Sequence, residues 1–146
     1  MYQLLTAQLK SLTEDNLYPI ANLANAAALL YDSLEQINWA GFYIMQDGKL
    51  ILGPFQGKAA CTQIAVGKGV CGRAAATGET QRVDDVHQFE GHIACDSASN
   101  SEIVIPLYKN GELFGVLDID SPITGRFCEE DQTGLEAFAR ALELAL

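Results

Sequence analysis

Two groups of reactive side chains lie close together in the second half of this sequence. They are Cys61, Cys71 and Cys95, followed by Glu102, Asp118 and Asp120. Thiols supply nucleophiles and electrons, and a carboxyl group beside them supplies a proton. This combination predicts the reduction of an oxidised small molecule.

The acidic residues predict a carboxyl group with an unusual pKa. Carboxylates crowded on one face of a sheet cannot all ionise cheaply, so the pKa of at least one should rise and let it act as a general acid. A solvated polar face is the alternative, and a hard cation such as Ca²⁺ or Mg²⁺ is another. The sequence lacks a dedicated calcium loop, and we expect neither a metal ion nor a cofactor.

The cysteines do not have the spacing typical of a zinc site, in which pairs lie two to four residues apart. Cys61 is expected to end a strand-like segment. Cys71 is expected to begin a short helix, whose dipole would lower the pKa of the thiol. The alternative for any single cysteine is that it is simply a small apolar side chain buried in the core. Cys128 lies apart from the others and is interpreted as structural or incidental.

Trp39 and Tyr43 would share one face of a strand, with Gly41 between them giving room. They predict either core packing or an aromatic wall for a small ligand. The glycines at 67, 69 and 72 resemble a dinucleotide-binding string. They lack the strand-and-helix context of that motif, so we interpret them as a loop that leads into a helix.

Composition limits the classes of partner. The 146 residues are 49% apolar and carry a formal net charge of −10, which favours one folded domain and argues against nucleic acid and anionic membranes. No stretch reaches the ~20 apolar residues of a membrane span. The N-terminal residues lack the pattern of a signal peptide, so we expect a reducing cytoplasm, where thiols stay free for chemistry.

Apolar periodicity and turn residues predict an α+β domain, with helices at both ends of the chain around an antiparallel sheet. The expected helices cover residues 3–12, 19–34, 70–77 and 129 to the C-terminus. The expected strands cover residues 37–45, 49–55, 80–83, 102–108 and 112–120, and a polar loop covers residues 84–101.

The last two strands form a hairpin whose register we predict from its faces. A three-residue loop over residues 109–111 would place Tyr108 opposite Glu112 and Glu102 opposite Asp118. That register keeps the apolar residues on one face and puts all three carboxylates on the other. A two-residue loop would shift the register by one residue and mix the faces.

Several segments together resemble a known family, the free methionine-R-sulfoxide reductases. The segments are NWAGFY at 38–43, Cys61, GKGVCGRA at 67–74, HIACD at 92–96 and GVLDIDSP at 115–122. The resemblance covers nearly the whole chain. It implies a single GAF domain over residues 1–146, with the terminal helices packed on one face of a central antiparallel sheet and a loop-covered ligand pocket on the other.

The resemblance also implies an activity and roles for the cysteines. The family reduces free methionine sulfoxide of R configuration at sulfur. Cys95 would attack the sulfoxide and Cys61 would then form a disulfide with it, while Cys71 is an alternative nucleophile or resolving thiol. Thioredoxin would restore the thiols, and a homodimer is expected because family members are often dimers.

The remaining implied roles belong to the acidic and aromatic residues. Glu102, Asp118 and Asp120 would bind and protonate the sulfoxide oxygen, and Trp39 and Tyr43 would enclose the methyl group. Two alternatives from other classes stay open at this point: a GAF-type sensor that binds a small ligand without turnover, and a thiol redox switch without a substrate.

Overall fold

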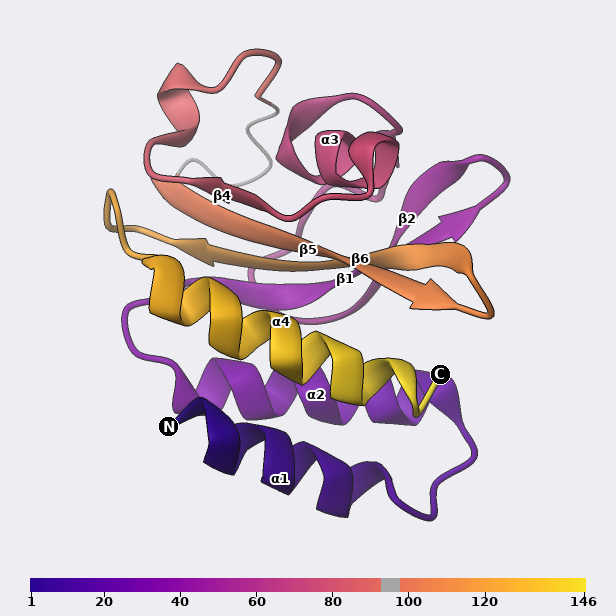
Figure 1. Ribbon diagram of the computed structural model, residues 1–146. Helices are drawn as coiled ribbons and strands as arrows, with labels where there is room; N and C mark the ends of the chain where they lie inside the picture. The colour runs from indigo at the N-terminus through magenta and orange to yellow at the C-terminus, as the bar shows by residue number, and fades with distance from the viewer. Residues whose placement is uncertain (93–97) are drawn as a thin grey trace.

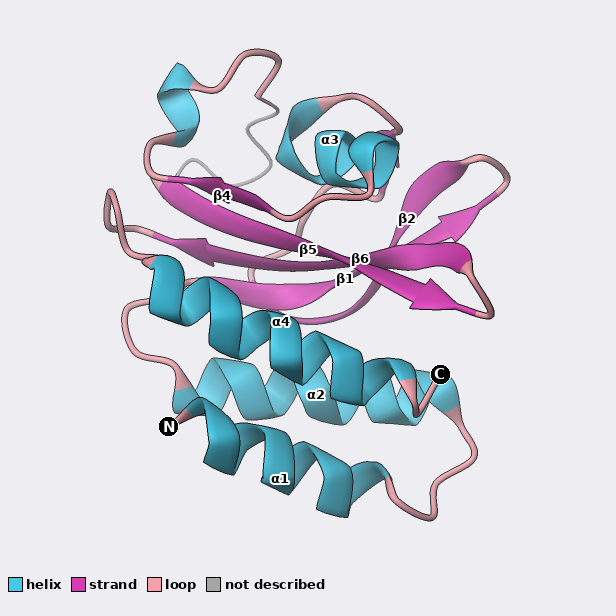
Figure 2. Cartoon of the chain, viewed as in Figure 1, coloured by secondary structure: helices cyan, strands magenta, loops and turns pink. Residues whose placement is uncertain are grey.

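The chain is built on one curled antiparallel sheet, shown in Figures 1 and 2. The computed structural model describes residues 1–92 and 98–146. Within these ranges the sheet has six strands in the order β3-β2-β1-β6-β5-β4, and every neighbouring pair is antiparallel. The strands are β1 (Trp39–Gln46), β2 (Lys49–Gly57), β3 (Gln63–Ala65), β4 (Gln81–Val83), β5 (Ser101–Lys109) and β6 (Glu112–Ser121).

Helices from both ends of the chain cover one face of the sheet (Figure 1). They are α1 (Tyr2–Thr13), α2 (Pro19–Ser33) and α4 (Glu129–Glu143). Their leucine, alanine and phenylalanine side chains form the larger apolar core with the inward residues of β1, β5 and β6. Among the helices in the described ranges, none combines the length and apolar character that a membrane span requires. The predicted α+β class and the placement of the terminal helices are confirmed.

The opposite face carries a smaller cover. It consists of α3 (Gly69–Thr77), the short 3₁₀ helix η1 (Val86–Gln88) and the connecting loops (Figure 2). A second apolar cluster lies between α3 and the sheet and includes Trp39, Tyr43, Val104 and Val116. Sequence reasoning missed β3 and η1, which are each three residues long. This face holds the candidate site.

Local sequence explains where the main elements begin and turn. Asp47 and Gly48 both have positive φ, which a two-residue hairpin turn requires, so the first hairpin forms as predicted. Pro19 opens α2 at a position where its missing N–H costs nothing. The Asp131 carboxylate accepts a hydrogen bond from the Cys128 N–H at 2.9 Å, which caps the first turn of α4.

The predicted register of the second hairpin is wrong. Lys109 pairs with Glu112, so the loop is the two-residue turn Asn110–Gly111, and both of its residues have positive φ. The register then shifts between Leu107 and Tyr108, because a β-bulge absorbs one extra residue of β6. Beyond this bulge the apolar residues return to the helix-covered face.

Candidate functional site

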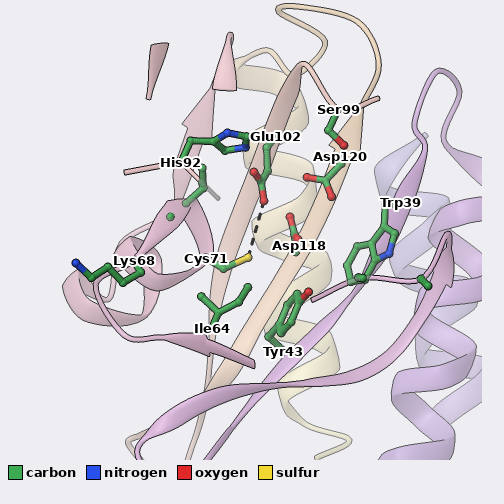
Figure 3. Close-up of a pocket in the computed structure, with 14 residues that line it drawn as sticks. Trp39, Tyr43, Ile64, Lys68, Cys71, His92, Ser99, Glu102, Asp118 and Asp120 are labelled. Carbon is green, nitrogen blue, oxygen red and sulfur yellow. Dashed lines mark hydrogen bonds between the residues drawn. The ribbon is translucent and has the colours of Figure 1, made fainter. Parts of the chain in front are cut away.

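A small cavity of about 50 Å³ opens on the sheet face that α3 covers (Figure 3). The middle strands β1, β5 and β6 form its floor, and α3 with the loops around it forms its walls. The residues that line it include Trp39, Tyr43, Cys71, Glu102, Asp118 and Asp120. The structure thus brings six of the predicted site residues into one cavity.

The carboxylates converge on the cavity floor from two neighbouring strands. Glu102 of β5 lies directly opposite Asp120 of β6, and Asp118 lies opposite Val104. The predicted pairing of Glu102 with Asp118 is therefore wrong, although all three carboxylates share one face as expected. Relative to the predicted register, the two-residue turn and the bulge each move the partner of Glu102 by one residue.

Two of these carboxyl groups lie almost out of contact with water. Glu102 is 8% exposed and Asp118 is 5% exposed. Burial raises the pKa of Glu102 well above its usual range, and the charge of Asp118 raises it further. Burial likewise raises the pKa of Asp118, with Asp120 as the next cause. The predicted rise is confirmed in direction, so this cluster holds at least one proton where an exposed carboxyl group would have lost it.

Cys71 points from α3 at this acidic cluster (Figure 3). Its Sγ donates a hydrogen bond to Glu102 Oε2 over 3.8 Å, and the residue is 4% exposed. Burial raises the pKa of the Cys71 thiol well above its usual range, followed by repulsion from Asp118 and Glu102. The prediction of a lowered pKa is wrong, because burial and facing carboxylates outweigh the dipole of a nine-residue helix.

The other cysteines occupy different surroundings. Cys61 lies in the loop between β2 and β3 rather than at the end of a strand, because β2 ends at Gly57. Its carbonyl accepts a hydrogen bond from Tyr43 Oη at 2.9 Å, and its sulfur is disulfide-bonded, whereas Cys71 and Cys128 are free. Cys128 is exposed and directly precedes α4. Cys95 lies outside the described residues.

Aromatic rings form the wall opposite the thiol (Figure 3). Trp39 stacks on Tyr43 with ring centroids 5.9 Å apart and on Phe55 at 5.1 Å. Trp39 Nε1 donates a hydrogen bond to the Lys58 carbonyl at 3.2 Å, which fixes the indole edge. Core packing is confirmed, because Trp39 and Tyr43 belong to an apolar cluster. Both residues also line the cavity, and their role as a wall for a ligand stays a prediction.

Sequence reasoning missed three polar residues of the cavity, Lys68, His92 and Ser99. Ser99 accepts a hydrogen bond from Asn38 Nδ2 at 3.3 Å, and the His92 ring meets the His87 ring edge-on at 6.1 Å. Burial lowers the pKa of His92, as does the nearby His87. His92 and Ser99 come from the loop before β5, which has no apolar periodicity that could have indicated which side chains face inward.

Comparison with known proteins agrees with this architecture. A family described as GAF domain matches residues 21–146. The chain is 58% identical over 127 residues to the free methionine-R-sulfoxide reductase of Escherichia coli, which covers 87% of this chain and 77% of that protein.

Solved structures are similar over almost the whole chain. The reduced form of fRMsr of Staphylococcus aureus superimposes with a TM-score of 0.97 and 55% identity, covering 99% of this chain and 94% of that one. The free methionine-R-sulfoxide reductase of Neisseria meningitidis, solved in complex with its substrate, has a TM-score of 0.95 and 44% identity, covering 99% of this chain and 87% of that one.

Proposed function

Because this chain belongs to the free methionine-R-sulfoxide reductases, a family of GAF-domain oxidoreductases, we propose that it reduces free methionine-R-sulfoxide to methionine in the cavity described above. One observation carries the proposal: a buried acidic cluster faces an aromatic wall inside a small cavity. A sulfoxide substrate needs both features. The acidic cluster can protonate its oxygen, and the aromatic wall can bury its methyl group away from water.

The acidic cluster supplies the proton. A sulfoxide oxygen is a poor leaving group until it is protonated, so an un-ionised carboxylic acid beside a thiolate lowers the barrier. Burial raises the pKa of both Glu102 and Asp118, which keeps a proton on the cluster. We assign proton donation to Glu102 and Asp118. Asp120, which lies on β6 with Asp118, helps to bind the substrate.

The thiol chemistry runs in two balanced steps. The Cys95 thiolate attacks the sulfoxide sulfur while the acidic cluster protonates the oxygen. The hydroxyl group then passes from the substrate sulfur to Cys95 as the new sulfur–sulfur bond breaks, so the products are methionine and a sulfenic acid on Cys95. The Cys61 thiol then displaces water from that sulfenic acid and forms a disulfide. Two observations favour Cys61 over Cys71 as the resolving thiol: Cys71 is buried with a raised pKa, and Cys71 is free where Cys61 is disulfide-bonded.

The aromatic wall selects the substrate. Trp39 and Tyr43 offer flat apolar surface for the sulfur-bound methyl group, while the small cavity favours a free amino acid over a peptide. We further propose that thioredoxin reduces the disulfide and that the protein works in the cytoplasm, where such dithiols are maintained. A homodimer remains a prediction.

A thioredoxin-coupled assay with separated R and S diastereomers tests this proposal. NADPH should be consumed with the free R form, and hardly at all with the S form or with peptide-bound methionine sulfoxide. A ligand sensor or a thiol switch would consume no NADPH with any of these compounds, and that result would refute the reductase function for this chain.

A further inference from the structure

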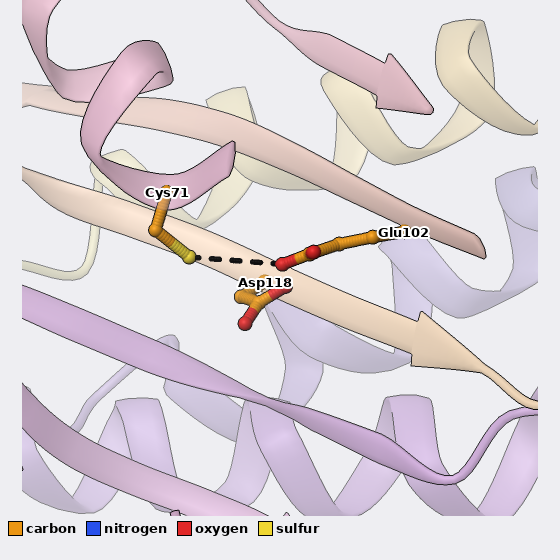
Figure 4. Close-up of side chains that lie close together, drawn as sticks. All are labelled: Cys71, Glu102 and Asp118. Atoms are coloured by element: carbon orange, nitrogen blue, oxygen red, sulfur yellow. Dashed lines mark hydrogen bonds between the residues drawn. The ribbon is translucent and has the colours of Figure 1, made fainter. Parts of the chain in front are cut away.

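Cys71, Glu102 and Asp118 direct three metal-binding atoms toward one point inside the cavity (Figure 4). One sulfur and two carboxylate oxygens lie within 4.8 Å of one another, and the Cys71 Sγ to Glu102 Oε2 distance is 3.8 Å. Zinc binds sulfur at about 2.3 Å and carboxylate oxygen at about 2.0–2.2 Å. A tetrahedral angle between those bonds places sulfur and oxygen about 3.5–3.7 Å apart, so only a small movement would be needed.

The burial of these side chains gives a second reason to expect an occupant. All three residues are buried, and Asp118 Oδ1 has no hydrogen-bond partner. An orphaned buried oxygen is costly, and a cation within bonding distance would offset that cost. We propose that Zn²⁺ binds here through Cys71 Sγ and one oxygen each of Glu102 and Asp118, with its fourth position open to the cavity.

The set of ligand atoms decides which metal fits. Ca²⁺ takes six to eight oxygen ligands and Mg²⁺ a near-octahedral set, and neither suits a thiolate. Three protein ligands that include a thiolate, with one position left for water, are typical of zinc. As zinc binds, the Cys71 thiol and the protonated carboxyl group of the cluster both give their protons to solvent, so binding weakens as pH falls.

Zinc bound at this point would reversibly inhibit the proposed reductase activity. The two carboxyl groups that bind zinc are those to which the proposed function assigns proton donation, and this consequence therefore rests on that function. Zinc and methionine-R-sulfoxide would compete for one cavity. The ion is thus an inhibitor rather than a cofactor.

Binding is tested without any activity assay. The full chain carrying Cys61→Ser, Cys95→Ser and Cys128→Ser keeps Cys71 as its only thiol. Titration with Co²⁺, a spectroscopic stand-in for Zn²⁺, should give a thiolate-to-cobalt charge-transfer band that saturates at one ion per chain and disappears on addition of Zn²⁺. Absence of the band would overturn the proposal.

Ligand variants locate the ion. Adding Cys71→Ala to that protein should abolish the band and weaken zinc binding, measured by calorimetry, by more than about 100-fold, since loss of even an outer-shell partner costs about 10- to 100-fold. Asp118→Asn keeps the thiol and should weaken binding at least tenfold. Glu79→Gln, an exposed carboxylate outside the cavity, is the matched control. Unchanged zinc affinity in both the Cys71 and the Asp118 variant would place the ion elsewhere.

Inhibition is measured separately as methionine released in one turnover by the reduced wild type without thioredoxin, whose own thiols bind zinc. Zinc should compete with the sulfoxide, and a chelator should restore the yield. Inhibition that excess substrate does not relieve would contradict a shared cavity. A protein that binds zinc through Cys71 yet releases no methionine would refute the proposed function and leave the zinc site standing.

Discussion

Glu102 and Asp120 are direct cross-strand partners in the ladder between β5 and β6. Like charges in this arrangement destabilise a sheet unless one is neutralised. Asp118 lies on the same face opposite Val104 and adds a third carboxyl group to the cluster. The cheapest way to relieve the repulsion is to retain a proton, which is what a general acid requires.

Glu102→Gln should therefore slow the reductive step by about 10²–10⁴-fold, the usual cost of losing general acid help. In the wild type the rate should fall as pH rises through the raised pKa of the cluster, and this high-pH limb should change in the variant. Rapid-quench measurement of methionine release in a single turnover, with a chelator present, gives both the rate and its dependence on pH. An unchanged rate and an unchanged limb would reduce Glu102 to a binding group, and the exposed Glu79→Gln serves as control.

The same proton makes stability depend on pH. A carboxyl group with a raised pKa in the folded state stabilises the protein below its ordinary pKa of about 4 and loses that contribution as pH rises through the raised value. The free energy of unfolding should thus decline from about pH 4 upward. Denaturant unfolding at several pH values should show a shallower decline in Asp118→Asn. The idea fails if the two slopes are equal.

The register of the second hairpin shows where sequence reasoning reached its limit. The apolar residues at 103, 105, 117 and 119 predicted the buried face correctly, because period-two alternation is a strong signal. Asn110 and Gly111 are typical of a two-residue turn, but such a turn without a bulge would mix the faces. The structure combines the two-residue turn with a single buried apolar face by means of a β-bulge. No single residue type predicts a bulge from the sequence.

The environment of Cys71 was beyond sequence reasoning for a different reason. A position near the start of a short helix was predicted, and α3 does begin at Gly69. The pKa of the thiol depends instead on burial against Glu102 and Asp118, which are distant in sequence. The sequence predicts which residues share a face of one hairpin. It does not predict which residues of the sheet α3 will contact, because those contacts depend on the tertiary fold.

The cysteines should differ sharply in single-turnover experiments. Cys95→Ser should release no methionine, whereas Cys71→Ser should still release up to one per chain, because a buried thiol with a raised pKa is a poor nucleophile. Cys61→Ser should complete that turnover and then accumulate sulfenic acid, detectable by a selective probe. The exposed Cys128→Ser is the matched control and should behave as wild type. Methionine release by Cys95→Ser would indicate that Cys71, not Cys95, is the nucleophile.

The aromatic wall depends on the absence of a side chain at Gly41, the residue between Trp39 and Tyr43. A Cβ built there would lie 2.2 Å from Phe55 Cβ and 2.9 Å from Trp39 Cη2, distances that real atoms do not adopt. Alanine usually stabilises a strand relative to glycine by about 0.5–1 kcal/mol. Here the overlap should reverse the sign and cost about 1–3 kcal/mol, as overpacking does.

Gly41→Ala should also displace the indole that lines the cavity, so KM for methionine-R-sulfoxide should rise more than kcat falls. Gly53→Ala is the matched control, because its added Cβ would lie 3.0 Å from Ile44 Cγ1 and 3.3 Å from the Phe42 carbonyl oxygen, milder contacts than those at Gly41. Gly53 does not line the cavity. Chemical denaturation and steady-state kinetics on both variants separate the two effects. If the two variants lose equal stability and keep the wild-type KM, the position of Trp39 does not depend on Gly41.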